Sequence, residues 1–409
     1  MSAALPAADP PPAFWWARDD LGYVDGRLTF AGTDVAGAAE TAEGALFLYS
    51  GRRVAANLGR LQDALAQVGR PTRIYYAMKA NRFAPLLEAM ARWGRCGIDA
   101  CSPEEVDRAL AAGFAPRDIS FTGTAVSNRD LERLLVHPDL VINCDSVGQI
   151  RRIGERAPGR EIGVRVNPER GTGYGGSERL TYAGGDVTKF GIYRRQWGEA
   201  LATARAHGLK VTSLHFHVGC GYLTRELDAW SAAVEAAMAF LADAPDVRTV
   251  NVGGGLGLPH REGDRPLDLA RWAAILRRHF AGRDLTVAVE PGDFLVKDAG
   301  LLVLQVVDVE PKRDVLFASV DGGFNLAPEP AYYDLPCEPA ACVLRDGPWE
   351  TVTIAGNINE ALDTWAPGKP MPPLAEGDRI AFLNAGGYAA SMSSNHCMRG
   401  AFEERLLDS

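Results

Sequence analysis

The sequence predicts an α/β fold in which a (β/α)8 barrel is followed by a C-terminal all-β domain. Strand and helix patterns alternate over about 250 residues, and that number of units favours a closed barrel over a doubly wound sheet. Beyond residue 296, strand patterns follow one another with Pro/Gly-rich turns between them. The chemically distinctive side chains follow strand ends, which is where barrel active sites are built.

These patterns divide the chain into three parts. We expect the barrel over residues 45–295, the β domain over 296–409, and an N-terminal segment, 1–44, that joins the β domain. The short N-terminal strands are assigned to the β domain because a closed barrel has no free edge to offer them.

The individual elements are predicted from apolar periodicity. Barrel-region strands are expected at 46–49, 73–77, 97–100, 119–122, 140–143, 161–166, 211–217, 249–252 and 286–290, with helices between most of them, including 53–68, 84–93 and 103–112. The N-terminal segment has strand patterns at 22–24 and 27–30, and the β domain at 301–309, 315–320, 341–343, 351–354 and 379–382. A helix is expected at 398–407.

Composition narrows the class of protein. Of 409 residues, 47% are hydrophobic and 23% charged, which is typical of a soluble globular chain. The formal charge of -9 argues against a nucleic-acid partner, and no apolar run is long enough to span a membrane. The Ala/Pro-rich start does not resemble a signal peptide. Seven dispersed cysteines without a CxxC pair predict reduced thiols in the cytoplasm.

Lys79 is the most informative residue. It follows a strand that is apolar on both faces, where a charged side chain is costly unless it is used. Burial lowers the pKa of a lysine and frees its amine to attack a carbonyl, as a Schiff-base lysine must. The alternative is a lysine that extends into solvent from the end of the strand.

A glycine cluster and a histidine pair follow two later strands. Gly253, Gly254 and Gly255 permit backbone N–H groups to approach a phosphate, although a triple glycine alone is weak evidence. His215 and His217 lie on one face of their strand. They predict a zinc site, a histidine stacked on a planar cofactor, or two packed histidines of the barrel interior.

Acidic and tyrosine-bearing turns complete the set of candidates. Glu290 ends a buried strand and needs a cationic partner, either a protonated pyridine nitrogen or an arginine. The β half carries turns at 321–325, 332–334, 356–360 and 384–388, each of which is compatible with ordinary turn chemistry.

In order, these segments resemble the fold-type III pyridoxal-phosphate decarboxylases, the family of diaminopimelate and ornithine decarboxylases. The resemblance covers nearly the whole chain after residue 45. It rests on Tyr-Ala-x-Lys-Ala-Asn, His-x-Gly, the triple glycine, Glu-Pro-Gly, a Gly-x-x-x-Glu turn and a late Gly-x-Tyr, at 76–81, 217–219, 253–255, 290–292, 356–360 and 386–388.

The resemblance implies a role for each residue. Lys79 would carry pyridoxal 5'-phosphate as a Schiff base, and His217 would stack on its ring. Gly253, Gly254, Gly255 and Tyr388 would hold the phosphate, and Glu290 would pair with the ring nitrogen. Asp99, Ser102 and Glu105 would support this pocket. The Gly-x-x-x-Glu turn implies a homodimer with shared active sites, in which Glu360 contacts substrate bound to the other subunit.

Several positions depart from the family pattern. Asn359 stands where the family has a cysteine assigned to proton delivery, which leaves Lys79, Tyr333 or a water for that step. Asp293 and Glu329 replace two arginines, and Cys220 replaces a serine that helps hold the phosphate.

The replaced arginines predict a changed substrate. A pocket with Asp293, Glu329, Asp334 and Glu360 would repel a distal carboxylate and favour a basic or polar distal group. We therefore expect decarboxylation of such an amino acid, or of a larger amine-bearing conjugate, in siderophore, antibiotic or polyamine-type metabolism, and not of diaminopimelate. Alternatively, Asp293 and Glu329 face solvent on loops.

Other functions remain open at this point. The same cofactor geometry would serve an amino-acid racemase or epimerase, and the missing cysteine favours that alternative. His215 and His217 would suit a metal-dependent barrel hydrolase. A non-catalytic carrier of the cofactor is disfavoured, because a carrier needs no loops that recognise a substrate.

Overall fold

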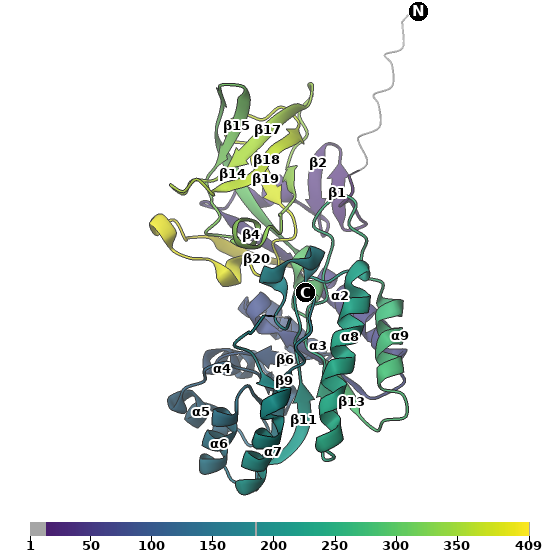
Figure 1. The fold of residues 1–409 in the computed structure, drawn as a ribbon. Helices are drawn as coiled ribbons and strands as arrows, with labels where there is room; N and C mark the ends of the chain where they lie inside the picture. The colour runs from purple at the N-terminus through teal and green to yellow at the C-terminus, as the bar shows by residue number, and fades with distance from the viewer. Residues whose placement is uncertain (1–13, 185, 409) are drawn as a thin grey trace, which may run out of the picture.

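The computed structural model describes residues 14–184 and 186–408, and the Ala/Pro-rich start of the chain lies outside them. Its larger domain is a closed barrel of eight parallel strands (Figure 1). In barrel order these are β5 (Thr72–Ala77), β6 (Gly97–Ala100), β7 (Ile119–Phe121), β8 (Val141–Cys144), β9 (Glu161–Asn167), β11 (Lys210–His215), β12 (Thr249–Asn251) and β13 (Thr286–Val289). Pairing of β13 with β5 closes the ring, so the predicted fold class is confirmed.

Helices surround the barrel. They are α2 (Gly51–Ala66), α3 (Ala84–Trp93), α4 (Pro103–Ala111), α5 (Asn128–Leu135), α6 (Val147–Arg156), α7 (Trp197–Ala206), α8 (Leu227–Met238) and α9 (Leu269–His279). A two-residue strand, β10 (Ile192–Tyr193), pairs with β9 outside the ring. Stacked Trp230 and Trp272, both fully buried, pack between α8 and α9. The apolar runs predicted as barrel strands from 73 to 290 all form strands.

The second domain is an eight-stranded sheet. Its strands are β14 (Gly300–Lys312), β15 (Val315–Val320), β16 (Pro339–Ala341), β17 (Glu350–Ala355), β18 (Thr364–Met371), β19 (Arg379–Phe382), β4 (Leu46–Ser50) and β20 (Glu403–Asp408). The long strand β14 organises the sheet: its first half lies between β4 and β19, and its second half pairs with β15.

Three details differ from the sequence-based expectations. The strand at 46–49 pairs with β14 and belongs to this sheet, so the barrel starts at β5 and not at residue 45. The helix expected at 398–407 is wrong: β20 forms there, because β4 offers a free edge that Glu403 and the following residues pair with in parallel. Strand β18 contains Pro367 and Pro370 and was not predicted; it lies at the end of the sheet, where proline is tolerated.

The N-terminal segment packs on the β domain without extending its sheet. β1 (Leu21–Val24), β2 (Arg27–Phe30) and β3 (Thr33–Asp34) form a separate sheet beside α1 (Val35–Ala39). Leu28 and Phe30 share a core with residues of β4 and β14, and a single bridge joins Arg27 to Val343. No helix in the described part of the chain is long and apolar enough to cross a membrane.

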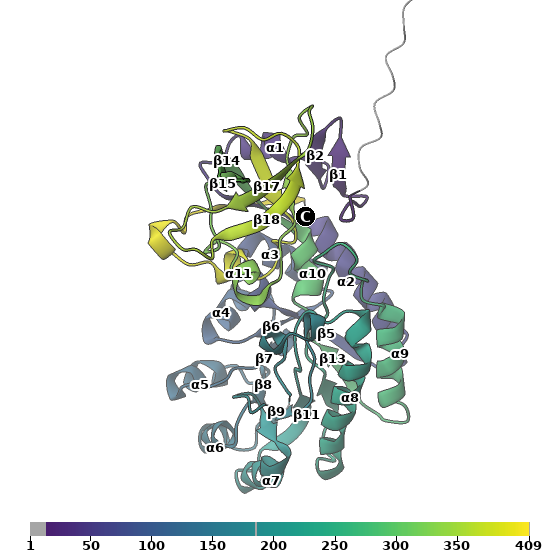
Figure 2. The ribbon, with the colours of Figure 1, turned by 45° about the horizontal axis from the view of Figure 1, so that its top comes forward.

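The two domains meet at the carboxyl ends of the barrel strands. Figure 2 shows α10 (Asp293–Val296) and α11 (Glu329–Tyr333) at this junction. The backbone N–H of Tyr388 donates to the Ala80 carbonyl at 2.8 Å, and the Asn81 side chain donates to the Gly386 carbonyl at 2.9 Å. These contacts hold the β domain over the barrel end where the sequence places the functional residues.

Candidate active site

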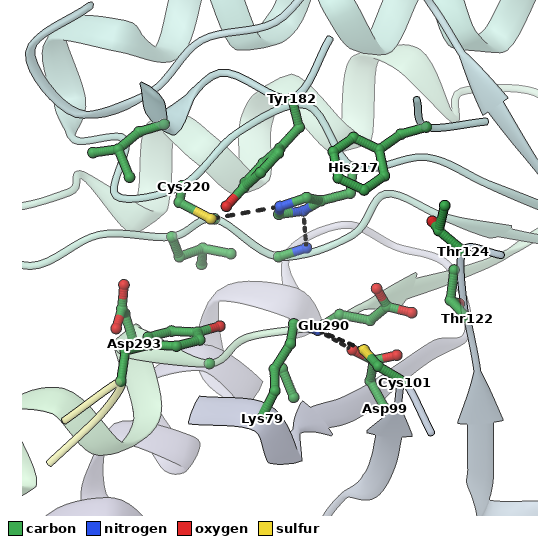
Figure 3. Close-up of a pocket in the computed structure, with 18 of the residues that line it drawn as sticks. Lys79, Asp99, Cys101, Thr122, Thr124, Tyr182, His217, Cys220, Glu290 and Asp293 are labelled. Atoms are coloured by element: carbon green, nitrogen blue, oxygen red, sulfur yellow. Dashed lines mark hydrogen bonds and ion pairs between the residues drawn. The ribbon is translucent and has the colours of Figure 1, made fainter. Parts of the chain in front are cut away.

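A cavity of about 490 Å³ lies at this junction. It is lined by twelve of the residues that the sequence singled out, which are Lys79, Asp99, His215, His217, Cys220, Gly254, Gly255, Glu290, Asp293, Glu329, Tyr333 and Tyr388. Both domains contribute, so neither one alone makes the complete wall (Figure 3).

Lys79 lies at the floor of the cavity. Strand β5 leads into a 3-10 turn, Met78–Ala80, which turns the lysine away from the core while its neighbours stay buried. Its ammonium nitrogen lies 2.7 Å from Asp99 Oδ2 and 3.5 Å from Cys101 Sγ. Burial acts to lower the pKa of Lys79, but the combined attraction of Asp99 and the acidic groups around it outweighs burial, and the pKa is raised well above its ordinary value. The pKa of Lys79 therefore shifts in the direction opposite to the one expected from burial alone.

Glu290 is buried within a hydrogen-bonded network. Its carboxylate accepts from the Asn251 side chain at 2.7 Å and lies 2.9 Å from His215 Nε2. Burial opposes ionisation, but His215 and nearby positive charge lower the pKa of Glu290. His215 thus packs against Glu290 inside the barrel. Across residues 14–184 and 186–408, no group of three or more His, Cys, Asp or Glu side chains is placed to hold a metal ion.

His217 presents a neutral ring to the cavity. Burial lowers the pKa of His217 to about 3. Its Nδ1 accepts a hydrogen bond from the Gly254 backbone N–H at 3.3 Å, and Cys220 Sγ lies 3.6 Å from its Nε2. The Tyr182 ring centroid is 5.2 Å away. A flat, uncharged ring held from two sides suits stacking against a planar cofactor.

The three glycines form a turn that no larger residue could adopt. Gly253 has a φ of +71°. A Cβ on Gly254 would lie 2.0 Å from the Glu290 carbonyl oxygen, and one on Gly255 would lie 2.0 Å from the Gly219 carbonyl oxygen. The backbone of this segment can therefore come close to a bound phosphate, and the residues present fit such a group.

Asp293 and Glu329 do not face solvent, although this was one alternative from the sequence. Both are buried, both line the cavity, and both contact the ammonium of Lys297, which is 1% exposed. Lys297 Nζ lies 3.3 Å from Asp293 Oδ1 and makes a short contact with Glu329 Oε2.

Other predicted residues lie outside the cavity. Ser102 caps α4 by accepting from the Glu105 N–H at 3.2 Å, and Glu105 in turn accepts from the Cys101 N–H at 2.6 Å. Asp334 points outward to Arg261, 2.8 Å away, with 92% of its side chain exposed. Asn359 and Glu360 are exposed, and Glu360 lies 3.5 Å from His396.

Four further residues were missed by the sequence reasoning. Cys101, Arg165, Tyr182 and Lys297 all lie at or directly behind the cavity wall. Only Lys297 had a signal, since it follows Asp293 by four residues and an i,i+4 pair on a helix brings the two side chains together.

The barrel carries a lysine after its first strand, a glycine turn and a buried glutamate. This combination is typical of enzymes that bind a phosphorylated carbonyl cofactor at the carboxyl ends of the barrel strands. The family model described as the pyridoxal binding domain of pyridoxal-dependent decarboxylases matches residues 52–297. This chain belongs to that family: it is a carboxy-lyase acting on an amino acid, and its cofactor is pyridoxal 5'-phosphate.

Relatives of known name align with this chain over nearly its full length. The chain is 33% identical over 401 residues to the diaminopimelate decarboxylase of Methanothermobacter thermautotrophicus, covering 93% of this chain and 91% of that protein. It is 32% identical over 389 residues to the diaminopimelate decarboxylase of Streptomyces coelicolor, covering 89% of this chain and 84% of that protein. The structure of the Helicobacter pylori diaminopimelate decarboxylase complexed with L-lysine has a TM-score of 0.82 and 27% identity, and the match covers 91% of this chain and 93% of that one.

Proposed function

We propose that this enzyme removes the α-carboxylate of an amino acid whose distal group is cationic or donates hydrogen bonds, and that diaminopimelate is not its principal substrate. The observation that carries this proposal is the charge of one wall. Asp293 and Glu329 line the cavity, while the cation between them, Lys297, lies behind the surface. A distal carboxylate placed against this wall would meet like charge.

The cofactor is assigned to the residues described above. Lys79 attaches it covalently, Gly253, Gly254, Gly255 and Tyr388 hold its phosphate, His217 packs on its ring and Glu290 faces its nitrogen. Bound there, pyridoxal 5'-phosphate supplies an electron sink for the bond to the carboxylate. The short contact between Glu290 and His215 supports this assignment, because it keeps the glutamate ionised opposite a cationic ring nitrogen.

Proton delivery is assigned to the chain's remaining groups. Asn359 is exposed, lies outside the cavity and has no useful proton to give. Lys79 holds a proton against Asp99, and Tyr333 also lines the cavity. We assign protonation of the product to Lys79, with Tyr333 as the alternative donor.

The assembly is proposed to be a homodimer. Glu360 is too far outward to line the cavity of its own chain, yet its turn is exposed and available to a second copy. We propose that it completes the partner's active site and contacts the substrate there.

A substrate panel tests the proposal. Carbon dioxide release would be measured from L-lysine, L-ornithine, L-arginine, meso-diaminopimelate and the neutral amino acid L-norleucine. We expect a basic amino acid to exceed diaminopimelate in kcat/KM by about tenfold or more. Efficient turnover of diaminopimelate alone would overturn the proposal. Chiral analysis of recovered substrate after incubation in D2O would reveal racemisation without release of carbon dioxide.

A further inference from the structure

A second cavity lies at the amino-terminal end of the barrel, on the side away from the active site. Its volume is about 940 Å³, and residues from seven of the eight barrel strands line it. Figure 2 shows that this end of the barrel points away from the β domain. The cavity is therefore the open mouth of the barrel and is separate from the cavity at the junction of the two domains.

The inside of this mouth is polar. Layers of bulky Val, Ile and Leu usually fill the interior of such a barrel. Here the cavity is lined instead by Ser120, Asn143, Ser213 and Asn251, each at most 7% exposed, with Gly163 beside them. Small polar residues leave space that apolar packing would have filled, and they line that space with hydroxyl and amide groups.

The rim of the mouth is cationic, although the whole chain has a formal charge of -9. The charged residues that line it are Arg73, Arg117, Arg160 and Arg248 on the positive side, and Asp139 and Glu161 on the negative side. Two of the arginines contact carboxylates: Arg73 lies 3.4 Å from Asp118, and Arg248 lies 2.5 Å from Glu161. Positive charge therefore exceeds negative charge around the opening.

Arg160 shows that this excess is not compensated within the chain. Its Nη2 donates to the carbonyl oxygens of His137 and Leu140, both at 2.8 Å, so uncharged groups hold the guanidinium in place. Burial lowers the pKa of Arg160 against the weaker attraction of Cys144 and Asp139. A partly buried guanidinium without a close counter-charge is costly, and an anion in the cavity would supply that charge.

One layer of side chains separates this cavity from the active site. On β11, Ser213 lines the second cavity, whereas His215, two residues later, lines the active site. On β12, Asn251 lines the second cavity, and its side chain donates to Glu290 at 2.7 Å on the other side. A ligand in the second cavity would therefore leave the cofactor pocket free.

We propose that the amino-terminal mouth of the barrel is a second binding site, which takes a small organic polyanion with carboxylate or phosphate groups on a polar body. Guanidinium groups bind either oxyanion through paired hydrogen bonds, and the hydroxyl and amide groups of the interior match a hydroxylated body. The cavity has the size of a small-molecule site and is larger than a single inorganic ion needs. This site is independent of the substrate and is not part of the proposed function.

Calorimetric titration of the cofactor-loaded enzyme tests the proposal. Citrate, D-glucose 6-phosphate, inorganic phosphate and uncharged D-glucose would be compared at constant ionic strength, since salt screens charged groups. We expect one saturable site per chain for citrate or the sugar phosphate, with a Kd of about 1 mM or below and at least about tenfold tighter than inorganic phosphate. D-glucose should not bind. The absorbance of the bound cofactor shows in each titration that the active site stays occupied.

Two variants place the binding at the mouth. The double variant Arg117→Gln, Arg248→Gln removes two rim charges whose side chains are 75% and 65% exposed, so it should fold normally. We expect it to bind the organic anion at least about tenfold more weakly. Ser213→Leu fills the interior and should weaken binding by a similar factor while leaving the rim charge intact.

A control of equal charge separates this site from long-range attraction. The double variant Arg151→Gln, Arg271→Gln changes the net charge by the same amount, on α6 and α9, where these arginines pair with Glu155 and Asp228. Its affinity should stay within about twofold of the wild-type value. No saturable binding of either organic anion would overturn the proposal, as would equal losses in the two double variants or undiminished binding in Arg117→Gln, Arg248→Gln. Inorganic phosphate that binds as tightly as both organic anions would overturn the assignment of an organic ligand.

Discussion

The ammonium of Lys79 lies 2.7 Å from a carboxylate oxygen of Asp99 on the adjacent barrel strand. The register of β5 and β6 produces this contact, because Ala77 pairs with Asp99 and Lys79 follows two residues later. Asp99 is 1% exposed and its second oxygen has no hydrogen-bond partner, whereas 42% of the Lys79 side chain is exposed. The lysine proposed to attach the cofactor therefore holds its proton beside a buried carboxylate that can accept it.

Replacing Asp99 should make this amine easier to deprotonate. In Asp99→Asn the attraction that raises the pKa of Lys79 is lost while burial remains, so the pKa falls. The pH midpoint for attachment of the cofactor to cofactor-free enzyme should move to lower pH, and kcat should fall about 10- to 100-fold because the proton acceptor is gone. Absorbance titration measures the midpoint. Asp107→Asn, an exposed carboxylate on α4, is the control; equal midpoints in both variants would contradict this role for Asp99.

The glycine turn should not tolerate even a methyl group. In Gly254→Ala the new Cβ would lie 2.0 Å from the Glu290 carbonyl oxygen, which is backbone and cannot rotate away. We expect cofactor affinity to fall at least about tenfold and the free energy of unfolding to fall by about 1–3 kcal/mol. Equilibrium dialysis and thermal unfolding measure these quantities. Gly198→Ala, where nothing lies within 4 Å of the added Cβ, should change neither by much.

The barrel, and the position of the candidate cofactor residues at the ends of its strands, could be predicted from sequence because both depend on local pattern. Apolar runs with one polar residue at their end mark parallel strands, and Lys79, Glu290 and the glycines each follow such a run. The strand at 46–49 has the same local pattern, but its partners in β14 lie 251 to 257 residues away, which no local signal reveals. The misassigned helix at 398–407 failed for the same reason, since pairing with β4 overrides the local preference.

The selectivity of the site was harder to predict than its cofactor chemistry. Asp293 and Glu329 were identified as acidic replacements, but their common partner Lys297, which contacts Glu329 across 32 residues of sequence, was not. Asp334 was expected in the pocket as one of its acidic residues, yet it lies at a positive φ of 55° and turns outward to Arg261. Whether a loop side chain faces inward depends on backbone geometry that composition does not determine.

Complementation between inactive subunits should reveal the shared site. Lys79→Ala alone should lose at least about 10³-fold in activity, since no other residue can attach the cofactor. Glu360→Ala should also lose activity, but through the other subunit, because the proposed role of Glu360 is in the partner's site. Mixing the two variants and allowing exchange should restore about one quarter of wild-type activity, because half of the dimers are mixed and each has one intact site. No recovery in mixtures shown to exchange subunits would contradict the dimeric site.

The ionisation of Glu329 should make substrate affinity depend on pH. Burial raises the pKa of Glu329 to about 7, against the opposing attraction of Lys297 and assisted by the charge of Asp293. Below this pKa the carboxyl is protonated and the wall is close to neutral, whereas above it the wall carries a net negative charge. The KM for a substrate with a distal ammonium should therefore fall as pH rises through about 7, by about three- to tenfold, until the substrate amine itself deprotonates.

Initial rates from pH 6 to 8.5 measure this dependence, and two comparisons isolate its cause. Glu329→Gln cannot ionise at this position, so its KM should stay high and nearly constant over the same range. The neutral analogue L-norleucine should show little change with the wild-type enzyme, since it presents no charge to the wall. A KM that falls equally for both substrates, or equally in Glu329→Gln, would assign the titration to another group.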